Sequence, residues 1–134
     1  MDEDCQFCRI AGGEADARIL YEDDRTAAFL DRNPAVEGHV LVVPKRHRRE
    51  LLVGDDSTAV WRTVRRVASA LEAALDPDGF STFHTSGPLV GNVEHAHVHL
   101  LPRDADDVVR ISLDRTPLRE DAVARITSLV RAEL

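Results

Sequence analysis

Residues 94–103 read EHAHVHLLPR and place His95, His97 and His99 at every second position. Successive side chains of a β-strand point to opposite faces, so a strand here would project all three imidazoles from one face. The intervening residues are apolar, and an apolar face is normally buried, which leaves the histidine face available for chemistry. Histidine titrates near neutral pH and is the commonest metal ligand, so the stretch predicts a catalytic or metal-binding site.

A polar stripe on a solvated surface is the alternative interpretation of this pattern. Half of the six histidines in the chain fall within these five positions, however. Three titratable groups gathered at one place are more typical of function than of surface filling.

Length and net charge limit the class of protein to which the chain can belong. The 134 residues predict one domain, 1–134, with a single core. The net charge of −7 argues against a general nucleic-acid-binding protein, because a phosphate backbone selects a basic surface. A basic run such as KRHRR at 45–49 is more often exposed to solvent than bound to phosphate.

No apolar stretch is long enough to span a membrane and the first four residues, MDED, are acidic, so we expect a cytoplasmic protein without membrane contact.

The two cysteines of the chain, Cys5 and Cys8, are spaced as Cys-x-x-Cys. In a reducing cytoplasm this spacing indicates half of a zinc site or a redox pair rather than a structural disulfide. The pair alone is a weak signal.

Apolar periodicity predicts an α+β fold, with an antiparallel sheet of five to six strands and helices on one side. Runs of β-branched and aromatic residues indicate strands, at 18–21, 26–30, 39–43, 80–85 and 95–101. A helical turn is expected at 9–12 and an extended tail at 108–113. A helical period over 57–75 predicts the long helix, with Asp56 or Ser57 as its N-cap.

A final helix is predicted at the C-terminal end of the chain. Thr116 is the expected N-cap and Pro117 the first helical residue. Its apolar side chains recur at a helical period and are expected to face the core; they are Ala122, Val123, Ile126, Leu129 and Val130.

Residues 95–101, HAHVHLL, fit the pattern His-φ-His-φ-His-φ-φ at every position, where φ is apolar. With CQFCRI at 5–10, FLDRNP at 29–34 and GHVLVVPKRH at 38–47, the chain resembles the histidine triad superfamily over residues 5–103. The resemblance implies that His97 is a nucleophile, which attacks the α-phosphorus of a nucleoside phosphate derivative and forms a nucleotidyl-histidine that water hydrolyses. It implies that His99 and His39 hold and neutralise the phosphate oxygens, while Asp31 accepts the ribose hydroxyls.

The same resemblance implies an apolar base pocket, whose four residues fit a plain core role equally well: Phe7, Ile10, Phe29 and Leu41. Ahead of the triad the chain departs from the family pattern, with Thr85-Ser86-Gly87 and Gly91-Asn92 and one residue fewer before the first histidine. Ser86 and Asn92 are the candidates for phosphate contacts there.

Zinc is implied by the cysteine-bearing branch of this family and by the related galactose-1-phosphate uridylyltransferases. By that resemblance the ligands are Cys5, Cys8, His47 and His95. Two thiolates and two imidazoles complete a tetrahedral set without an open position, so the zinc would be structural.

Three functions stay open from the sequence. The resemblance implies a Hint-like hydrolase or nucleotidyl transferase acting on a nucleoside phosphoramidate, a nucleotidyl adduct or a similar α-phosphate bond. The alternatives are a Fhit-like dinucleoside polyphosphate hydrolase and a non-catalytic nucleotide-binding or interaction module. The expected partners are a purine nucleotide and a second copy of the chain. The helix 57–75 carries Trp61, which either belongs to the core or is covered by that second copy.

Overall fold

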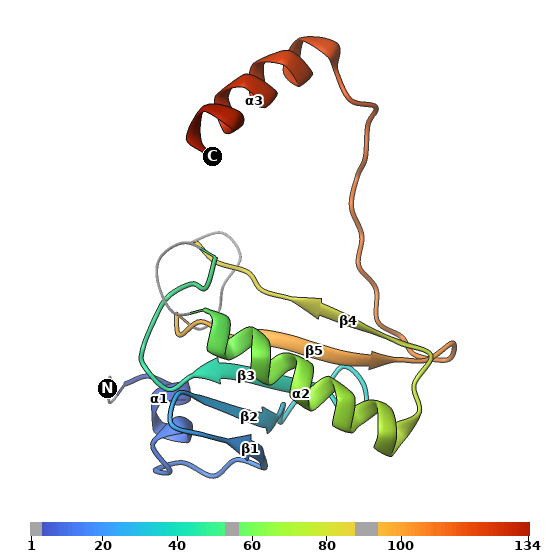
Figure 1. Cartoon of the computed structure of the whole chain (residues 1–134). Coiled ribbons are helices and arrows are strands. Elements are labelled where there is room, and N and C mark those ends of the chain that lie inside the picture. Colours follow the sequence, from blue (N-terminus) through green and yellow to red (C-terminus); the bar gives the residue numbers. More distant parts are fainter. Residues whose placement is uncertain (1–3, 53–56, 88–93) are drawn as a thin grey trace.

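The computed structural model describes residues 4–52, 57–87 and 94–134, so the predicted site residue Asn92 lies outside the described part. Its centre is a five-stranded sheet in the order β1-β2-β3-β5-β4, antiparallel throughout (Figure 1). The strands are β1 (Ile19–Glu22), β2 (Thr26–Leu30), β3 (Val40–Pro44), β4 (Gly79–Phe83) and β5 (Val98–Arg103). The helices are α1 (Gln6–Ala11), α2 (Thr58–Leu75) and α3 (Glu120–Glu133). The predicted α+β class with an antiparallel sheet is confirmed.

The central strand β3 is buried over its whole length, as a continuous run of β-branched residues predicts. Alternate residues of β2 and β3 supply two apolar faces, and β5 adds apolar residues to one of them. On one face Val42, Val98 and Leu100 meet α2. On the other, Phe29 and Leu41 meet α1. The sheet therefore has a helix on each face.

Helix α2 covers the first face with Val60, Val64, Val67 and Leu71, which recur at the helical period. Ser57 is the N-cap residue, as predicted, although its side chain makes no capping hydrogen bond. Trp61 is half-buried against this same core, so it has partners within its own chain.

Glycine is required at position 38, where the β2–β3 connection passes the end of α2. Gly38 has a φ of 89°, and a Cβ there would lie 2.9 Å from Leu75 Cδ1 and 3.0 Å from Pro102 Cγ. Both the left-handed backbone and the lack of space exclude a larger residue.

The expectation that all helices lie on one side of the sheet is wrong, because α1 packs on the face opposite α2. The helix spans Gln6–Ala11 rather than 9–12, and Cys5 is its N-cap, with Sγ accepting from the Cys8 N–H at 3.4 Å. A six-residue helix has too few turns for periodicity to reveal which face it buries.

The triad strand begins at Val98, three residues later than predicted. The backbone ahead of it makes its hydrogen bonds elsewhere, since Ala96 N–H donates to the Arg48 carbonyl in the loop after β3. Strand β4 covers Gly79–Phe83 instead of 80–85.

The last helix differs most from expectation. Its N-cap is Arg119 rather than Thr116, and none of its residues is buried. Residues 108–119 carry no helix or strand and lead to α3, which stands clear of the sheet (Figure 1). The prediction that its apolar side chains face the core of their own chain is therefore wrong. No helix in the described residues has the length and apolar character that a membrane crossing requires.

Candidate functional site

The three histidines lie on the α1 face of the sheet, around the start of β5. The ring centroids of His97 and His99 are 5.0 Å apart, and the Phe7 ring of α1 lies 4.9 Å from that of His97. The intervening Ala96, Val98 and Leu100 belong to the core beneath α2. The predicted division between a histidine face and a core face is therefore confirmed, even though only His99 lies within the strand.

A chain of hydrogen bonds fixes the tautomers of two histidines. The Ala35 N–H donates to His39 Nδ1 at 3.0 Å, so the proton of a neutral His39 is on Nε2. His39 Nε2 lies 2.9 Å from His99 Nδ1 and donates to it. His99 therefore keeps its own proton on Nε2. The Asp31 carboxylate lies 3.6 Å from His39 Nε2 and is the charged neighbour of this relay.

His97 is oriented by the backbone of the residue two positions before it. Its Nδ1 lies 2.8 Å from the His95 carbonyl oxygen. A carbonyl only accepts, so Nδ1 carries the proton and Nε2 of the neutral ring has a lone pair. An imidazole in this state is a nucleophile at Nε2.

Burial keeps the relay uncharged. It lowers the pKa of His99 to about 4, with further lowering from the neighbouring His97 and His39. Burial also lowers the pKa of His39, against an opposing effect of Asp31. At neutral pH both rings therefore act as hydrogen-bond donors and not as cations.

A cavity of about 1,090 Å³ lies in front of these rings. It brings together seven of the predicted site residues: Phe7, Ile10, Phe29, Asp31, Leu41, His97 and His99. The four apolar ones also belong to the core cluster under α1, so each of them both packs in the core and lines the cavity. His39 does not line the cavity and acts from behind His99.

Other lining residues were missed by the sequence reasoning: Gln6, Asp16, Arg18, Arg32, Asn33, Phe83 and Thr85. Among these residues Phe83 makes the closest contact with the triad. Its ring stacks on that of His99, with 4.3 Å between centroids and 18° between planes. Cross-strand pairing of Phe83 with His99 places it there, and an aromatic residue in the strand before the triad was the available signal. Thr85 lines the cavity, whereas Ser86 is exposed and is not among the lining residues, so its contact with phosphate stays a prediction.

No role was predicted for His84 from the sequence. Both of its ring nitrogens are buried and lack a hydrogen-bond partner within the described residues. Burial lowers its pKa, and Glu50 and His97 are the charged or titratable groups that act on it.

The predicted metal ligands meet on the same side of the sheet, at the N-terminal end of α1. His95 Nδ1 lies 3.4 Å from Cys5 Sγ and 3.3 Å from Cys8 Sγ, and His47 Nδ1 lies 3.2 Å from Cys8 Sγ. The four ligand atoms all lie within 4.8 Å of one another. Both cysteines are free thiols.

The donor set and its surroundings fit a tetrahedral zinc ion. Ligand atoms about 2.0–2.3 Å from zinc lie roughly 3.5 Å from each other, close to the separations here. His95 Nε2 donates to the Pro44 carbonyl at 2.7 Å, which leaves the lone pair of Nδ1 directed at the thiols. His95 and Cys8 are completely buried.

Comparison with protein families matches residues 12–106 to the HIT domain. An uncharacterized HIT-like protein of Methanocaldococcus jannaschii is 38% identical over 106 residues, 77% of this chain and 81% of that protein. The adenylylsulfatase HINT3 of Arabidopsis thaliana is 35% identical over 140 residues, with 100% of this chain and 71% of that protein covered.

Solved structures are similar over nearly the whole chain. SMU.412c from Streptococcus mutans UA159 is 32% identical with a TM-score of 0.90, covering 99% of this chain and 87% of that one. A HIT family protein from Bacillus anthracis is 26% identical with a TM-score of 0.88, covering 100% and 99%. A Zn-bound histidine triad family protein from Mycobacterium smegmatis is 32% identical with a TM-score of 0.71, covering 94% and 97%.

Proposed function

The chain belongs to the HIT domain family, and from that premise we propose that it is a nucleotide hydrolase with His97 as its nucleophile. The observation that carries the proposal is the hydrogen bond from His97 Nδ1 to the His95 carbonyl, because it leaves Nε2 unprotonated toward the cavity. A nucleophile needs such a lone pair at the moment of attack.

The proposed reaction has two steps. The lone pair of His97 Nε2 attacks the α-phosphorus, an N–P bond forms, and the bond from phosphorus to the leaving group breaks with its electron pair. Water then attacks the same phosphorus, and the electron pair of the N–P bond returns to Nε2. The attacking water loses one proton and the departed leaving group takes one up, so the products are a nucleoside monophosphate, the protonated leaving group and the free imidazole. His99 Nε2–H, supported by His39, donates to a phosphate oxygen in both steps.

The lining of the cavity supports a nucleoside substrate. The apolar walls built by Phe7, Ile10, Phe29 and Leu41 suit a purine base, and the Asp31 carboxylate accepts from ribose hydroxyls. The relative named as an adenylylsulfatase supports an adenylyl group with its scissile bond at the α-phosphate. We propose a phosphoramidate, adenylyl adduct or related anhydride as the substrate class.

Zinc, cellular location and assembly complete the proposal. We propose a structural zinc ion held by Cys5, Cys8, His47 and His95, on the grounds of their mutual distances and the Zn-bound relative. Two free thiols at that site favour the reducing cytoplasm. A homodimer is the proposed assembly.

The decisive experiment follows a label on the α-phosphate. Rapid quench of the wild-type protein with labelled adenosine phosphoramidate, diadenosine triphosphate or adenylyl sulfate should trap an acid-labile adduct on the chain. His97→Ala should form no adduct and lose at least about three powers of ten in turnover, since the whole reaction path is removed. It should still bind AMP. Thr82→Ala, an exposed change in the neighbouring strand β4, should turn over normally.

Two results would count against this proposal. Near-normal turnover by His97→Ala would mean that another group attacks phosphorus. Binding of AMP by the wild-type protein, with no turnover of any member of the panel, would favour the non-catalytic nucleotide-binding module.

A further inference from the structure

The Phe83 side chain touches the triad but has no part in the proposed reaction. Its ring lies against that of His99, with 4.3 Å between centroids and 18° between planes. Antiparallel pairing of β4 with β5 sets the two residues directly opposite each other. Side chains of such a pair extend from the same face of the sheet, so the backbone itself brings the two rings together.

The ring of His99 has two further aromatic neighbours. The ring of His39 lies 5.2 Å away, with its Nε2 in the relay, and the ring of His97 lies 5.0 Å away at an inclination of 64°. Both neighbours carry nitrogens that donate or accept hydrogen bonds. Phe83 carries none, so its ring restrains the plane of His99 without competing for its proton.

The orientation of the His99 ring decides whether the relay reaches a substrate. In the observed orientation Nδ1 faces His39 Nε2 at 2.9 Å, and Nε2–H lies on the opposite side of the ring. A half-turn about the Cβ–Cγ bond would exchange each nitrogen with a carbon. His39 would then face a C–H group, and the donor to the phosphate oxygen would be lost. The hydrogen bond from His39 opposes this turn at one edge of the ring, and Phe83 opposes it over the ring face.

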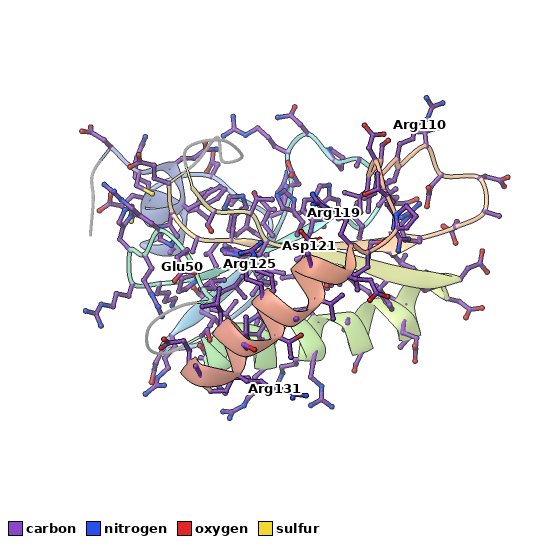
Figure 2. The ribbon with its side chains drawn as sticks, turned by 90° about the horizontal axis from the view of Figure 1, so that it is seen from above. Glu50, Arg110, Arg119, Asp121, Arg125 and Arg131 are labelled. Carbon is purple, nitrogen blue, oxygen red and sulfur yellow. The ribbon has the colours of Figure 1, made fainter. Side chains whose placement is uncertain are left out.

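Helix α3 adds no lining residue on this side of the described cavity. It passes over the body in Figure 2, which labels Asp121, Arg125 and Arg131 along it, whereas Figure 1 shows that it stands clear of the sheet. Phe83 lines the cavity and is 38% exposed. Because the side chain is exposed to this extent, we expect the fold to tolerate a smaller residue at this position.

We propose that Phe83 is a positioning residue, which holds the ring of His99 so that its Nε2–H points at the phosphate oxygen. The proposal rests on the nucleotide hydrolase proposed above. The orientation of His99 can nevertheless be measured without turnover, so the two proposals can fail separately.

Nitrogen NMR of the full chain with isotope-labelled histidine measures this orientation. The wild-type protein should show His99 with its proton on Nε2 only, and His99→Gln identifies the signal by removing it. Phe83→Leu should show both tautomers, or a signal broadened by exchange between them, because the ring face is no longer held. Phe83→Tyr should restore the wild-type signal, since it keeps the flat ring and its hydroxyl can reach water at this exposed position.

Turnover of an adenosine phosphoramidate gives the second readout. Phe83→Leu should lower kcat roughly three- to tenfold, the factor that an aromatic pair of this kind supplies, and should leave the affinity for AMP within about twofold. Phe80→Leu is the matched control, because it makes the same change on the same strand where the ring packs against the core beneath α2. It should lower the stability of the protein without changing kcat or the His99 signal.

Two results would overturn the proposal. A His99 signal or a kcat that Phe83→Leu leaves at the wild-type value would mean that His39 alone orients the ring. Equal effects of Phe80→Leu and Phe83→Leu would mean that general packing of β4 is responsible. Circular dichroism checks that each variant is folded, and Phe83→Met, which also lacks a flat ring, replaces a Phe83→Leu variant that does not fold. A wild-type protein without turnover would contradict the hydrolase, while the NMR comparison would still decide whether Phe83 orients His99.

Discussion

Two backbone groups decide how the imidazoles of the site are protonated. The Ala35 N–H sets the tautomer of His39 and, through it, that of His99, while the His95 carbonyl sets that of His97. A neutral imidazole carries one proton. A hydrogen bond that sets the protonation of one ring nitrogen therefore also sets that of the other. The proposed nucleophile and its neighbouring donor are thus prepared before a substrate arrives, which would avoid reorganisation during the reaction.

The buried relay should make the stability of the protein depend on pH. In the unfolded chain His99 takes up a proton near its ordinary pKa of 6.5, but in the folded chain only near 4. Between these values the unfolded state binds more protons, so the free energy of unfolding falls as the pH is lowered from about 6.5 to about 4. The groups facing His99 are His97, His39 and Asp31.

Urea denaturation of the wild-type protein and of His99→Gln measures this effect. The stability of the wild type relative to the variant should decrease as the pH falls through that window and stay constant above about pH 7. Protonation of the Cys2His2 cluster affects both proteins and cancels in the difference. A difference that does not vary with pH would show that His99 titrates near its ordinary value.

The gathering of these side chains at one place was predictable from the sequence, whereas their tautomers were not. The alternation of histidine with apolar residues places His97 and His99 on one face because strand geometry is regular. The tautomers depend on Ala35 and on a main-chain carbonyl, which no side-chain pattern reports. Phe83 was missed for a similar reason, because its contact with His99 comes from cross-strand register.

At the scale of elements, the Cys2His2 cluster connects three parts of the chain that are distant in sequence. Cys5 and Cys8 come from α1, His47 from the loop after β3, and His95 from the segment before β5. A six-residue helix is not stable by itself, so α1 depends on this cluster and on its packing against the sheet. Helix α1 also supplies Phe7 and Ile10 to the cavity, so the cluster positions one wall of the site.

Zinc removal should therefore be visible as a loss of stability. Elemental analysis of protein purified without added metal should give about one zinc per chain, and a strong chelator should lower the melting temperature by roughly 10 °C or more. Cys8→Ser should lose the zinc. Arg9→Ala, an exposed change on the same helix, should retain it. A metal-free protein that melts at the same temperature with and without chelator would contradict the site.

Elements with an unbroken apolar pattern that pack on the sheet were predicted closely. The β3 strand and the α2 helix agree with their predicted limits to within a residue or two, because both carry extended apolar patterns. Strand β5 begins later than predicted, since Ala96 ahead of it bonds to the loop after β3 rather than to a strand. The face covered by α1 was not predictable, because the sheet is apolar on both sides.

At the scale of the whole molecule, α3 shows that an amphipathic pattern predicts a helix but not the surface that covers its apolar face. The spacing of Val123, Ile126 and Val130 indicates that one face of the helix avoids water, and the helix does form. The pattern does not say which surface covers that face. Its assignment to the core of the same chain is wrong, because none of these side chains is buried there.

The proposed homodimer would tie the stability of the fold to protein concentration. Association that requires the folded chain stabilises it by mass action, so the melting temperature should rise with concentration, by about 2–5 °C for each tenfold increase. Fluorescence of Trp61, half-buried against the core beneath α2, reports the transition without a label. A variant with Ile126→Asp and Leu129→Asp, which places two charges on the exposed apolar side of α3, should melt at a temperature independent of concentration, while a control with Ala124→Asp and Ser128→Asp should behave as the wild type. A wild-type melting temperature that stays constant over a hundredfold range of concentration would contradict the proposed homodimer, because stabilisation by a second copy must weaken as copies become scarce.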